Sequence, residues 1–228
     1  MHKVFPRSAS ISLAIALSGG LTIFARKVEL GGVSLGYVFM PLTTLLILLL
    51  AATAPQSSGP RYQWSVVAGL LFSLAGDVCL MLPKDLFLAG LLAFLVAHVC
   101  YLVAFTADCR FGSRFVPFAV WGSIGLVVLV VLWARIPSAL RLPVMAYAGV
   151  LLTMAAQAAS RAMELRAVPA AAAAMGASLF VVSDTLLAIN RFGWDLPASR
   201  LLVLGTYFTA QWLIARSVYQ RRSGVGIR

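Results

Sequence analysis

Long apolar stretches separated by short polar breaks make up almost the whole chain. We count eight such stretches of about 15 to 23 residues, most of them close to the length that an α-helix rising 1.5 Å per residue needs to cross a hydrocarbon layer about 30 Å thick. They cover residues 8–25, 36–54, 64–82, 86–107, 115–133, 142–159, 168–190 and 201–215. The pattern therefore predicts an all-α, polytopic membrane bundle of about eight transmembrane helices.

The breaks between the stretches are short and rich in Gly, Pro, Ser and charged residues, as in turns. Examples are the SSGPR sequence at 57–61, the charged segment at 161–166 and the segment from Gly193 to Pro197. No break is long enough to fold alone, so we expect one integral membrane domain over residues 1–228.

Composition agrees with this interpretation. The chain is 61% hydrophobic and 11% charged, whereas soluble domains carry about 25% charged residues. Its formal charge of +11 comes from Lys and Arg dispersed at the ends of apolar stretches, which favours membrane lipids over nucleic acid as partners. The three Cys residues have no metal-ligand spacing and their number is odd, so we expect no disulfide framework. No obligate protein partner is predicted.

Basic residues also predict an orientation. More of them fall on the side that holds both termini, such as Arg61, Arg114 and Arg216, than on the other side, which holds Lys84 and Arg191. Because cytoplasmic loops are enriched in Lys and Arg, both termini are predicted to be cytoplasmic. We expect a multi-pass protein of a plasma membrane or bacterial inner membrane.

Two acidic residues interrupt the apolar stretches. Asp77 lies in LFSLAGDVCLMLP, residues 71–83, and Asp184 lies in LFVVSDTLLAINRF, residues 179–192. An ionisable group at membrane depth costs between ~2.5 and ~17 kcal/mol, so it is rare and usually functional. Each lies about five or six residues before the end of its stretch, and the two stretches end on the same side of the membrane. At 1.5 Å per residue, both carboxylates lie ~8 to 9 Å below that side. We expect the two carboxylates to occupy one layer and to be catalytic.

Other polar residues reach a similar depth or extend this layer. Such residues in membrane helices commonly serve as interhelical contacts, and a single His commonly packs in a core, so a purely structural role stays open for each. The candidates are Thr43, Thr44, Ser73, His98, Tyr101, Tyr147, Tyr207 and Gln211.

Paired carboxylates in a dry site can divide the work of hydrolysis. One stays protonated as a general acid, while the other is ionised and acts as a base for water. This suits cleavage through an oxocarbenium-like cation, and also peptide hydrolysis by an aspartate pair. A metal site is disfavoured because the chain has only His2 and His98. A small proton-coupled transporter is the non-enzyme alternative, although no inverted repeat is evident.

Four segments carry a resemblance to a known family. The sequences SLAGDVCLMLP, GLLAFLVAHVCYLVAF, SLFVVSDTLLAINRF and LGTYFTAQWLIA are similar to the YhhN-type lysoplasmalogenases, multi-pass enzymes that hydrolyse the vinyl ether bond of lysoplasmalogens. The resemblance implies an eight-helix bundle, a lysophospholipid substrate with an ethanolamine or choline head group, and release of a fatty aldehyde and a glycerophospho-alcohol. Its motifs fall on Gly76-Asp77, Ser183-Asp184, Tyr207 with Gln211, and His98 with Tyr101.

The chain departs from the family at one position. Relatives often carry Lys before the proline of the second stretch, where this chain has Met40-Pro41. If that Lys contacts the substrate phosphate, another cation must replace it here, and Lys84 and Arg191 are candidates because each follows a stretch that holds an Asp. Snorkelling to the interface is the alternative role for both. Asn190, beside Arg191, is also predicted to bind substrate.

The chemistry and the resemblance together suggest one mechanism. A vinyl ether protonated on its β-carbon becomes an oxocarbenium ion, which water captures as a hemiacetal that collapses to aldehyde and alcohol. One Asp would supply the proton, and the other would orient water and stabilise the cation. The sequence leaves open which Asp has which role, and no cofactor is expected.

Overall fold

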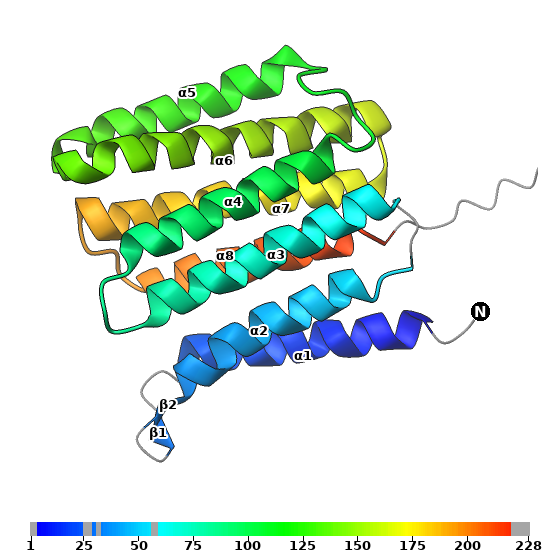
Figure 1. Ribbon diagram of the computed structural model, residues 1–228, viewed down its shortest axis with the longest axis horizontal. Helices are drawn as coiled ribbons and strands as arrows, with labels where there is room; N and C mark the ends of the chain where they lie inside the picture. Colours follow the sequence, from blue (N-terminus) through cyan, green and yellow to red (C-terminus); the bar gives the residue numbers. More distant parts are fainter. Residues whose placement is uncertain (1–3, 25–28, 31–32, 56–58, 220–228) are drawn as a thin grey trace, which may run out of the picture.

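The computed structural model describes residues 4–24, 29–30, 33–55 and 59–219 and is all-helical apart from one two-residue strand pair. Figure 1 shows the helices lying side by side along a common direction. The elements are α1 (Val4–Phe24), β1 (Glu29–Leu30), β2 (Val33–Ser34), α2 (Leu35–Ala52), α3 (Pro60–Met81), α4 (Phe87–Phe105), α5 (Phe115–Leu132), η2 (Trp133–Arg135), α6 (Ser138–Leu165), α7 (Val168–Ala188), η3 (Ile189–Gly193) and α8 (Ser199–Arg216). The predicted all-α fold is confirmed.

Six helical segments of the described chain are long and apolar enough to cross a membrane: α2, α3, α4, residues 115–135, α6 and residues 168–193. The apolar part of α1, Ser8–Phe24, is shorter. In α8, Arg200, Arg216 and Gln211 lower the mean hydropathy. The chain is therefore an integral multi-pass membrane protein, while the total of about eight spans and the side of the termini stay predictions.

The bundle has two helix pairs at its edges and four helices between them. Figure 1 shows α5 and α6 at one edge, α1 and α2 at the other, and α3, α4, α7 and α8 in the middle. The most extensive helix contacts join α3 to α4 and α7 to α8, and α2 packs on both α3 and α8. Asp77 on α3 and Asp184 on α7 therefore both belong to the central part of the bundle.

The break predicted at residues 161–166 is wrong in its position, because α6 continues to Leu165. Arg161 is 1% exposed and donates two hydrogen bonds of 2.6 Å to the carboxylate of Asp108. Its guanidinium also lies 4.6 Å from the ring centroid of Tyr62. A paired Arg can remain in a buried helix, and the turn comes at Arg166, which has a φ of 47°.

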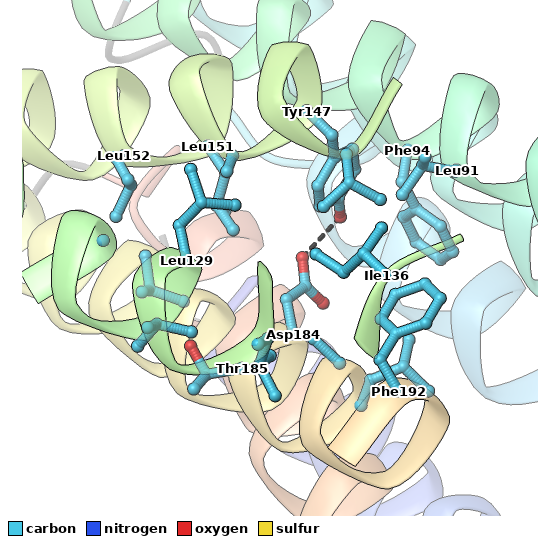
Figure 2. A pocket seen from close by; sticks show the side chains of 18 of the residues that line it. Leu91, Phe94, Leu129, Ile136, Tyr147, Leu151, Leu152, Asp184, Thr185 and Phe192 are labelled. Atoms are coloured by element: carbon cyan, nitrogen blue, oxygen red, sulfur yellow. Dashed lines mark hydrogen bonds between the residues drawn. The ribbon is translucent and has the colours of Figure 1, made fainter. Parts of the chain in front are cut away.

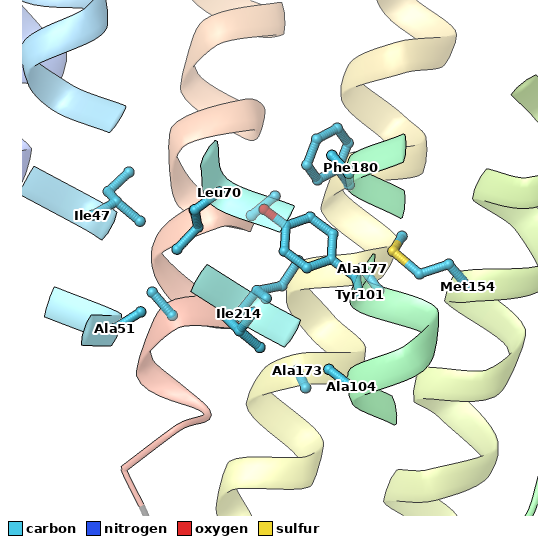
Figure 3. Close-up of a cluster of buried hydrophobic side chains, with 14 of the residues drawn as sticks. Ile47, Ala51, Leu70, Tyr101, Ala104, Met154, Ala173, Ala177, Phe180 and Ile214 are labelled. Atoms are coloured by element: carbon cyan, nitrogen blue, oxygen red, sulfur yellow. The ribbon is translucent and has the colours of Figure 1, made fainter. Parts of the chain in front are cut away.

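The central helices approach each other closely where one of them carries glycine. Figure 3 shows the buried cluster, in which Tyr101 and Phe180 lie among smaller apolar side chains. A Cβ atom at Gly69 would lie 2.3 Å from the Tyr101 ring, and one at Gly76 would lie 2.5 Å from the Phe94 ring. These glycines make room for the aromatic side chains of α4, which is how helices in lipid gain contact area.

Gly176 gives a test of this packing. A Cβ atom there would lie 2.8 Å from the main-chain oxygen of Ala210 and 2.9 Å from a side-chain carbon of Ile214, so α7 and α8 would have to separate. We expect Gly176→Ala to lower the free energy of unfolding by about 1 to 3 kcal/mol. Thermal unfolding in detergent would measure this. The matched control is Gly149→Ala, because a Cβ atom at Gly149 meets nothing within 4 Å; equal midpoints for the two variants would contradict the prediction.

Candidate active site

Asp77 is a buried carboxylate held by hydroxyl groups from two other helices. It lies near the end of α3 and is 1% exposed. The Thr44 hydroxyl on α2 donates a hydrogen bond of 2.6 Å to Asp77 Oδ2, and the Tyr207 hydroxyl on α8 donates a second. These two donors replace the water that the carboxylate loses on burial.

A chain of polar side chains extends from Asp77 into the bundle. The Gln211 side-chain amide donates to the Tyr207 hydroxyl at 3.1 Å, and the Tyr101 hydroxyl donates to Gln211 Oε1 at 2.6 Å. Ser73 and Tyr101 are 3.3 Å apart between their hydroxyl oxygens. The Tyr207 hydroxyl oxygen accepts the hydrogen bond from Gln211, so its own proton is available to be donated to Asp77. The structure thus brings most of the sequence-predicted polar residues together around Asp77.

Thr43 lies apart from this network. Its hydroxyl bonds to the main-chain oxygen of Phe39 at 2.7 Å and to the Ser18 hydroxyl of α1 at 2.8 Å. Neighbouring residues on a helix point in directions about 100° apart, so Thr44 reaches Asp77 while Thr43 faces α1. The structure places Thr43 in the α1–α2 interface.

Asp184 occupies a different setting on α7. Its side chain is partly exposed and accepts a hydrogen bond from the Tyr147 hydroxyl on α6. It lines a cavity of about 110 Å³ between α4, α5, α6 and α7, drawn in Figure 2. Apart from Asp184, Tyr147 and Thr185, the side chains that line this cavity are apolar, and they include Phe94, Leu129, Leu151, Val181 and Phe192.

An aromatic layer separates the surroundings of the two carboxylates. The Tyr207 ring lies 5.8 Å from the Phe94 ring and 5.5 Å from the Phe180 ring, both measured between centroids. The Phe94 ring also lies 6.2 Å from the Phe180 ring, so the three rings contact one another. No hydrogen bond within the described part of the chain joins the two carboxylates directly. Asp77 and Asp184 are therefore the centres of two adjoining polar groups, and Asp184 alone of the two lines the cavity.

His98 lies beside both groups. It is 0% exposed, and its ring is 4.6 Å from the Phe180 ring, 5.2 Å from the Tyr147 ring and 6.4 Å from the Tyr101 ring. Neither ring nitrogen has a hydrogen-bond partner among residues 4–24, 29–30, 33–55 and 59–219. Buried polar groups are nearly always paired, so His98 keeps hydrogen-bonding capacity that water or a ligand can use.

The other three predicted residues lie at the end of the cavity marked by Phe87 and Phe192. Arg191 forms an ion pair of 2.8 Å with Asp85 in the α3–α4 loop, and its hydrogen bond holds the pKa of the Asp85 carboxyl below its usual value. Asn190 Oδ1 accepts a hydrogen bond of 3.3 Å from the Leu196 amide, and Lys84 is exposed. Both Asn190 and Arg191 belong to the π-helical turn η3 that extends α7.

Comparison with known proteins identifies the family. The family model described as the YhhN family matches residues 35–218, from the start of α2 to just beyond α8. The chain belongs to the YhhN family. This confirms the resemblance noted from the four sequence segments, and the matched range includes every predicted site residue.

Relatives in the YhhN family come from bacteria and mammals. The uncharacterized membrane protein YhhN of Escherichia coli O157:H7 is 31% identical over 208 residues, which cover 91% of this chain and 97% of that protein. Lysoplasmalogenase TMEM86B of Sus scrofa is 35% identical over 190 residues, covering 79% of this chain and 73% of that protein. Lysoplasmalogenase TMEM86A of Homo sapiens is 33% identical over 173 residues, covering 70% and 67%. No solved structure matches.

Some lining residues of this YhhN-family cavity carry no signal in the sequence. Phe94, Leu129 and Phe192 look like lipid-facing residues of apolar helices, and only the packing of α4, α5 and η3 turns them inward. Thr185 could have been suspected because it follows Asp184 directly. Among the described residues, no group of three or more His, Cys, Asp and Glu side chains is arranged to hold a metal ion.

Proposed function

We propose that this YhhN-family protein hydrolyses the vinyl ether bond of lysoplasmalogen, releasing a fatty aldehyde and glycerophosphoethanolamine or glycerophosphocholine. The observation that carries the proposal is the position of Asp184, a carboxyl group on the wall of a largely apolar cavity inside a membrane bundle. Relatives named lysoplasmalogenase, at 33% to 35% identity, support the reaction class. A one-chain lipid fits such a cavity because its hydrocarbon needs an apolar wall while its reacting bond needs an acid.

The cavity is long enough to hold part of a hydrocarbon chain. Along α5 its lining runs from Ile124 to Leu132, a distance of about 12 Å at 1.5 Å per residue. Most of α5 faces outward, since only Pro117 and Leu132 among its residues are buried. In this proposal, α5 forms the wall between the bound chain and the surrounding lipid.

Asp184 is the proposed acid. Its proton transfers to the β-carbon of the vinyl ether. The substrate becomes an oxocarbenium ion, and Asp184 becomes a carboxylate. Water then adds to the α-carbon of the oxocarbenium ion and returns a proton to Asp184. The product of this addition is a hemiacetal. The hemiacetal collapses to the aldehyde and the glycerol hydroxyl, so the net change is the addition of one water molecule. Tyr147, which donates to one Asp184 oxygen, fixes the orientation of the carboxyl.

Asp77 is the proposed electrostatic partner. It accepts hydrogen bonds from both Thr44 and Tyr207, an arrangement that stabilises an ionised carboxylate. A fixed negative charge in a medium of low dielectric stabilises a cation that develops nearby more strongly than it would in water. This division of labour assigns proton transfer to the carboxyl that lines the cavity and charge stabilisation to the one that does not.

We further propose that all eight helices cross the membrane with both termini in the cytoplasm. Two features support this: α1 has 21 residues and α8 has 18, each close to the length of a span, and α8 packs against α7 along the bundle. In this orientation the cavity end marked by Phe87 and Phe192 faces the outer side of the membrane.

A substrate panel tests the proposed activity. The purified protein in lipid nanodiscs should release aldehyde from 1-alkenyl lysophospholipids, and it should leave the saturated 1-alkyl ether analogue, diacyl phospholipid and model peptides intact. We expect a chelator to leave the rate unchanged. Cleavage of a peptide or an ester in place of the vinyl ether would show a different hydrolase, and uptake into proteoliposomes without any product would show a transporter.

A further inference from the structure

The outer end of the cavity carries two arginines that the proposed reaction does not use. Arg135 Nη1 donates a hydrogen bond of 2.6 Å to the main-chain oxygen of Gly193, and Arg141 Nε donates one of 3.3 Å to that of Ile136. Ile136 lines the cavity, and Gly193 directly follows the lining residue Phe192. Both guanidinium groups are therefore attached to the rim of the cavity that holds Asp184.

Both guanidinium groups are also held over aromatic rings. The Arg135 guanidinium carbon lies 5.5 Å from the Trp194 ring centroid, and that of Arg141 lies 4.9 Å from the Trp133 ring centroid. A guanidinium has five N–H donors in a planar fork, and the hydrogen bonds above use one donor of each group. Stacking and one backbone hydrogen bond limit the motion of each side chain while leaving donors for another acceptor.

No ion pair among the described residues neutralises these two charges. In the part of the chain that the structure describes, ion pairs join Arg114 to Glu164, Arg161 to Asp108 and Arg191 to Asp85, and neither Arg135 nor Arg141 takes part in one. Arg191, which the sequence suggested as the phosphate-binding cation, thus already has a carboxylate partner. In the proposed orientation Arg135 and Arg141 lie on the outer side of the membrane. The enrichment of Lys and Arg in cytoplasmic loops therefore does not explain their presence there.

We propose that Arg135 and Arg141 form the subsite that binds the phosphodiester of the lysolipid head group. The proposal rests on the proposed function and names the part of the protein that recognises the polar end of the substrate. Arginine suits this role because its forked donors match two phosphate oxygens at once. A cavity lined by apolar groups binds the chain without recognising phosphate, so a separate cationic rim is what would select a lysophospholipid over a neutral ether lipid.

The spacing is compatible with one lipid reaching both sites. Asp184 and Gly193 are nine residues apart, which corresponds to about 13 Å along the helix axis. In a lysoplasmalogen, six covalent bonds of about 1.5 Å each separate the vinyl ether carbon from phosphorus, a span of roughly 7 Å when extended. The remaining distance of about 6 Å corresponds to two contacts of about 3 Å each, one between an Asp184 oxygen and the vinyl ether carbon and one between a guanidinium nitrogen at the rim and a phosphate oxygen.

The test compares substrates with and without phosphate in the full-length protein. We expect the double variant Arg135→Gln/Arg141→Gln to raise the KM for 1-alkenyl glycerophosphoethanolamine about tenfold or more with little change in kcat. The same variant should hydrolyse 1-alkenyl glycerol, which lacks the phosphate, as the unchanged protein does. Arg114→Gln is the matched control, since it removes an exposed arginine on α5's opposite end that pairs with Glu164.

Binding of the non-hydrolysable 1-alkyl lysophospholipid separates this inference from the proposed reaction. Suppose that the protein cleaves no vinyl ether, but that the double variant loses affinity for this analogue and keeps its affinity for 1-alkyl glycerol. The proposed hydrolysis would then be wrong, while the phosphate subsite would be supported. An equal loss for both lipids, or no loss for either, overturns the subsite. Inorganic phosphate is the third probe: if it displaces the analogue as well as the lysophospholipid does, the site recognises free phosphate and the assignment to the lipid head group is overturned.

Discussion

Asp184→Asn is expected to reduce kcat for aldehyde release by about 1,000-fold, because asparagine cannot supply the proton that the β-carbon of the vinyl ether needs. The amide has nearly the same shape as the carboxyl, and its oxygen can still accept the hydrogen bond from Tyr147. The cavity should therefore keep its form, and the KM should change little. Single-turnover measurement of aldehyde from a 1-alkenyl lysophospholipid would determine the rate of the chemical step directly.

The control for this variant is Asp195→Asn. Asp195 is exposed and lies beyond the π-helical turn, so its carboxylate plays no part in the proposed reaction. It should retain the unchanged rate. If Asp184→Asn kept a rate within tenfold of the unchanged protein, the proton would have to come from another group, and the assignment of the acid to Asp184 would be wrong. Asp184→Glu provides a further comparison, because it keeps the acid and shifts it by one methylene group.

The sequence predicted the membrane bundle well because lipid imposes simple rules on a chain. A segment within the hydrocarbon layer must satisfy its own main-chain hydrogen bonds, so a long apolar stretch is almost always a helix. Helix ends were harder to predict where a polar residue has a partner far along the chain. Arg161 looked like the start of a turn, yet its pairing with Asp108 across 53 positions keeps it within α6.

Depth along a helix can be read from the sequence, but direction around its axis cannot. Asp77 and Asp184 could be assigned to one layer by counting residues from the ends of their stretches. Which neighbour each one faces depends on how the helices pack, and only the structure shows Thr44 and Tyr207 beside Asp77 and Tyr147 beside Asp184. The same limit explains why Thr43 and Thr44 could not be told apart.

This difference in surroundings gives the two carboxyl groups distinct proposed roles that the sequence left open. Asp184 has one hydroxyl donor and lines the cavity, whereas Asp77 has two donors and is buried. A group that must exchange a proton with substrate has to touch it. A group that stabilises charge need not, because electrostatic interactions act over several ångströms in a medium of low dielectric.

The role proposed for Asp77 predicts that Asp77→Asn lowers kcat by about 100-fold or more while the KM for lysoplasmalogen changes little. The substitution removes the negative charge and places an amide where Thr44 and Tyr207 both donate. Tyr207→Phe removes one donor and keeps the charge, so we expect a smaller loss of about tenfold. Both rates are measured with the same 1-alkenyl lysophospholipid.

Unfolding measurements decide whether Asp77 acts on the reaction or only on the fold. Burying an amide that faces two hydroxyl donors costs stability, so the midpoint of thermal unfolding should fall in Asp77→Asn. A purely structural Asp77 would leave the folded fraction fully active, and activity would then follow the unfolding curve. An electrostatic role requires the folded protein to be slow well below its midpoint. It also requires the variant to bind the 1-alkyl analogue normally, because that lipid never develops the positive charge that Asp77 is proposed to stabilise.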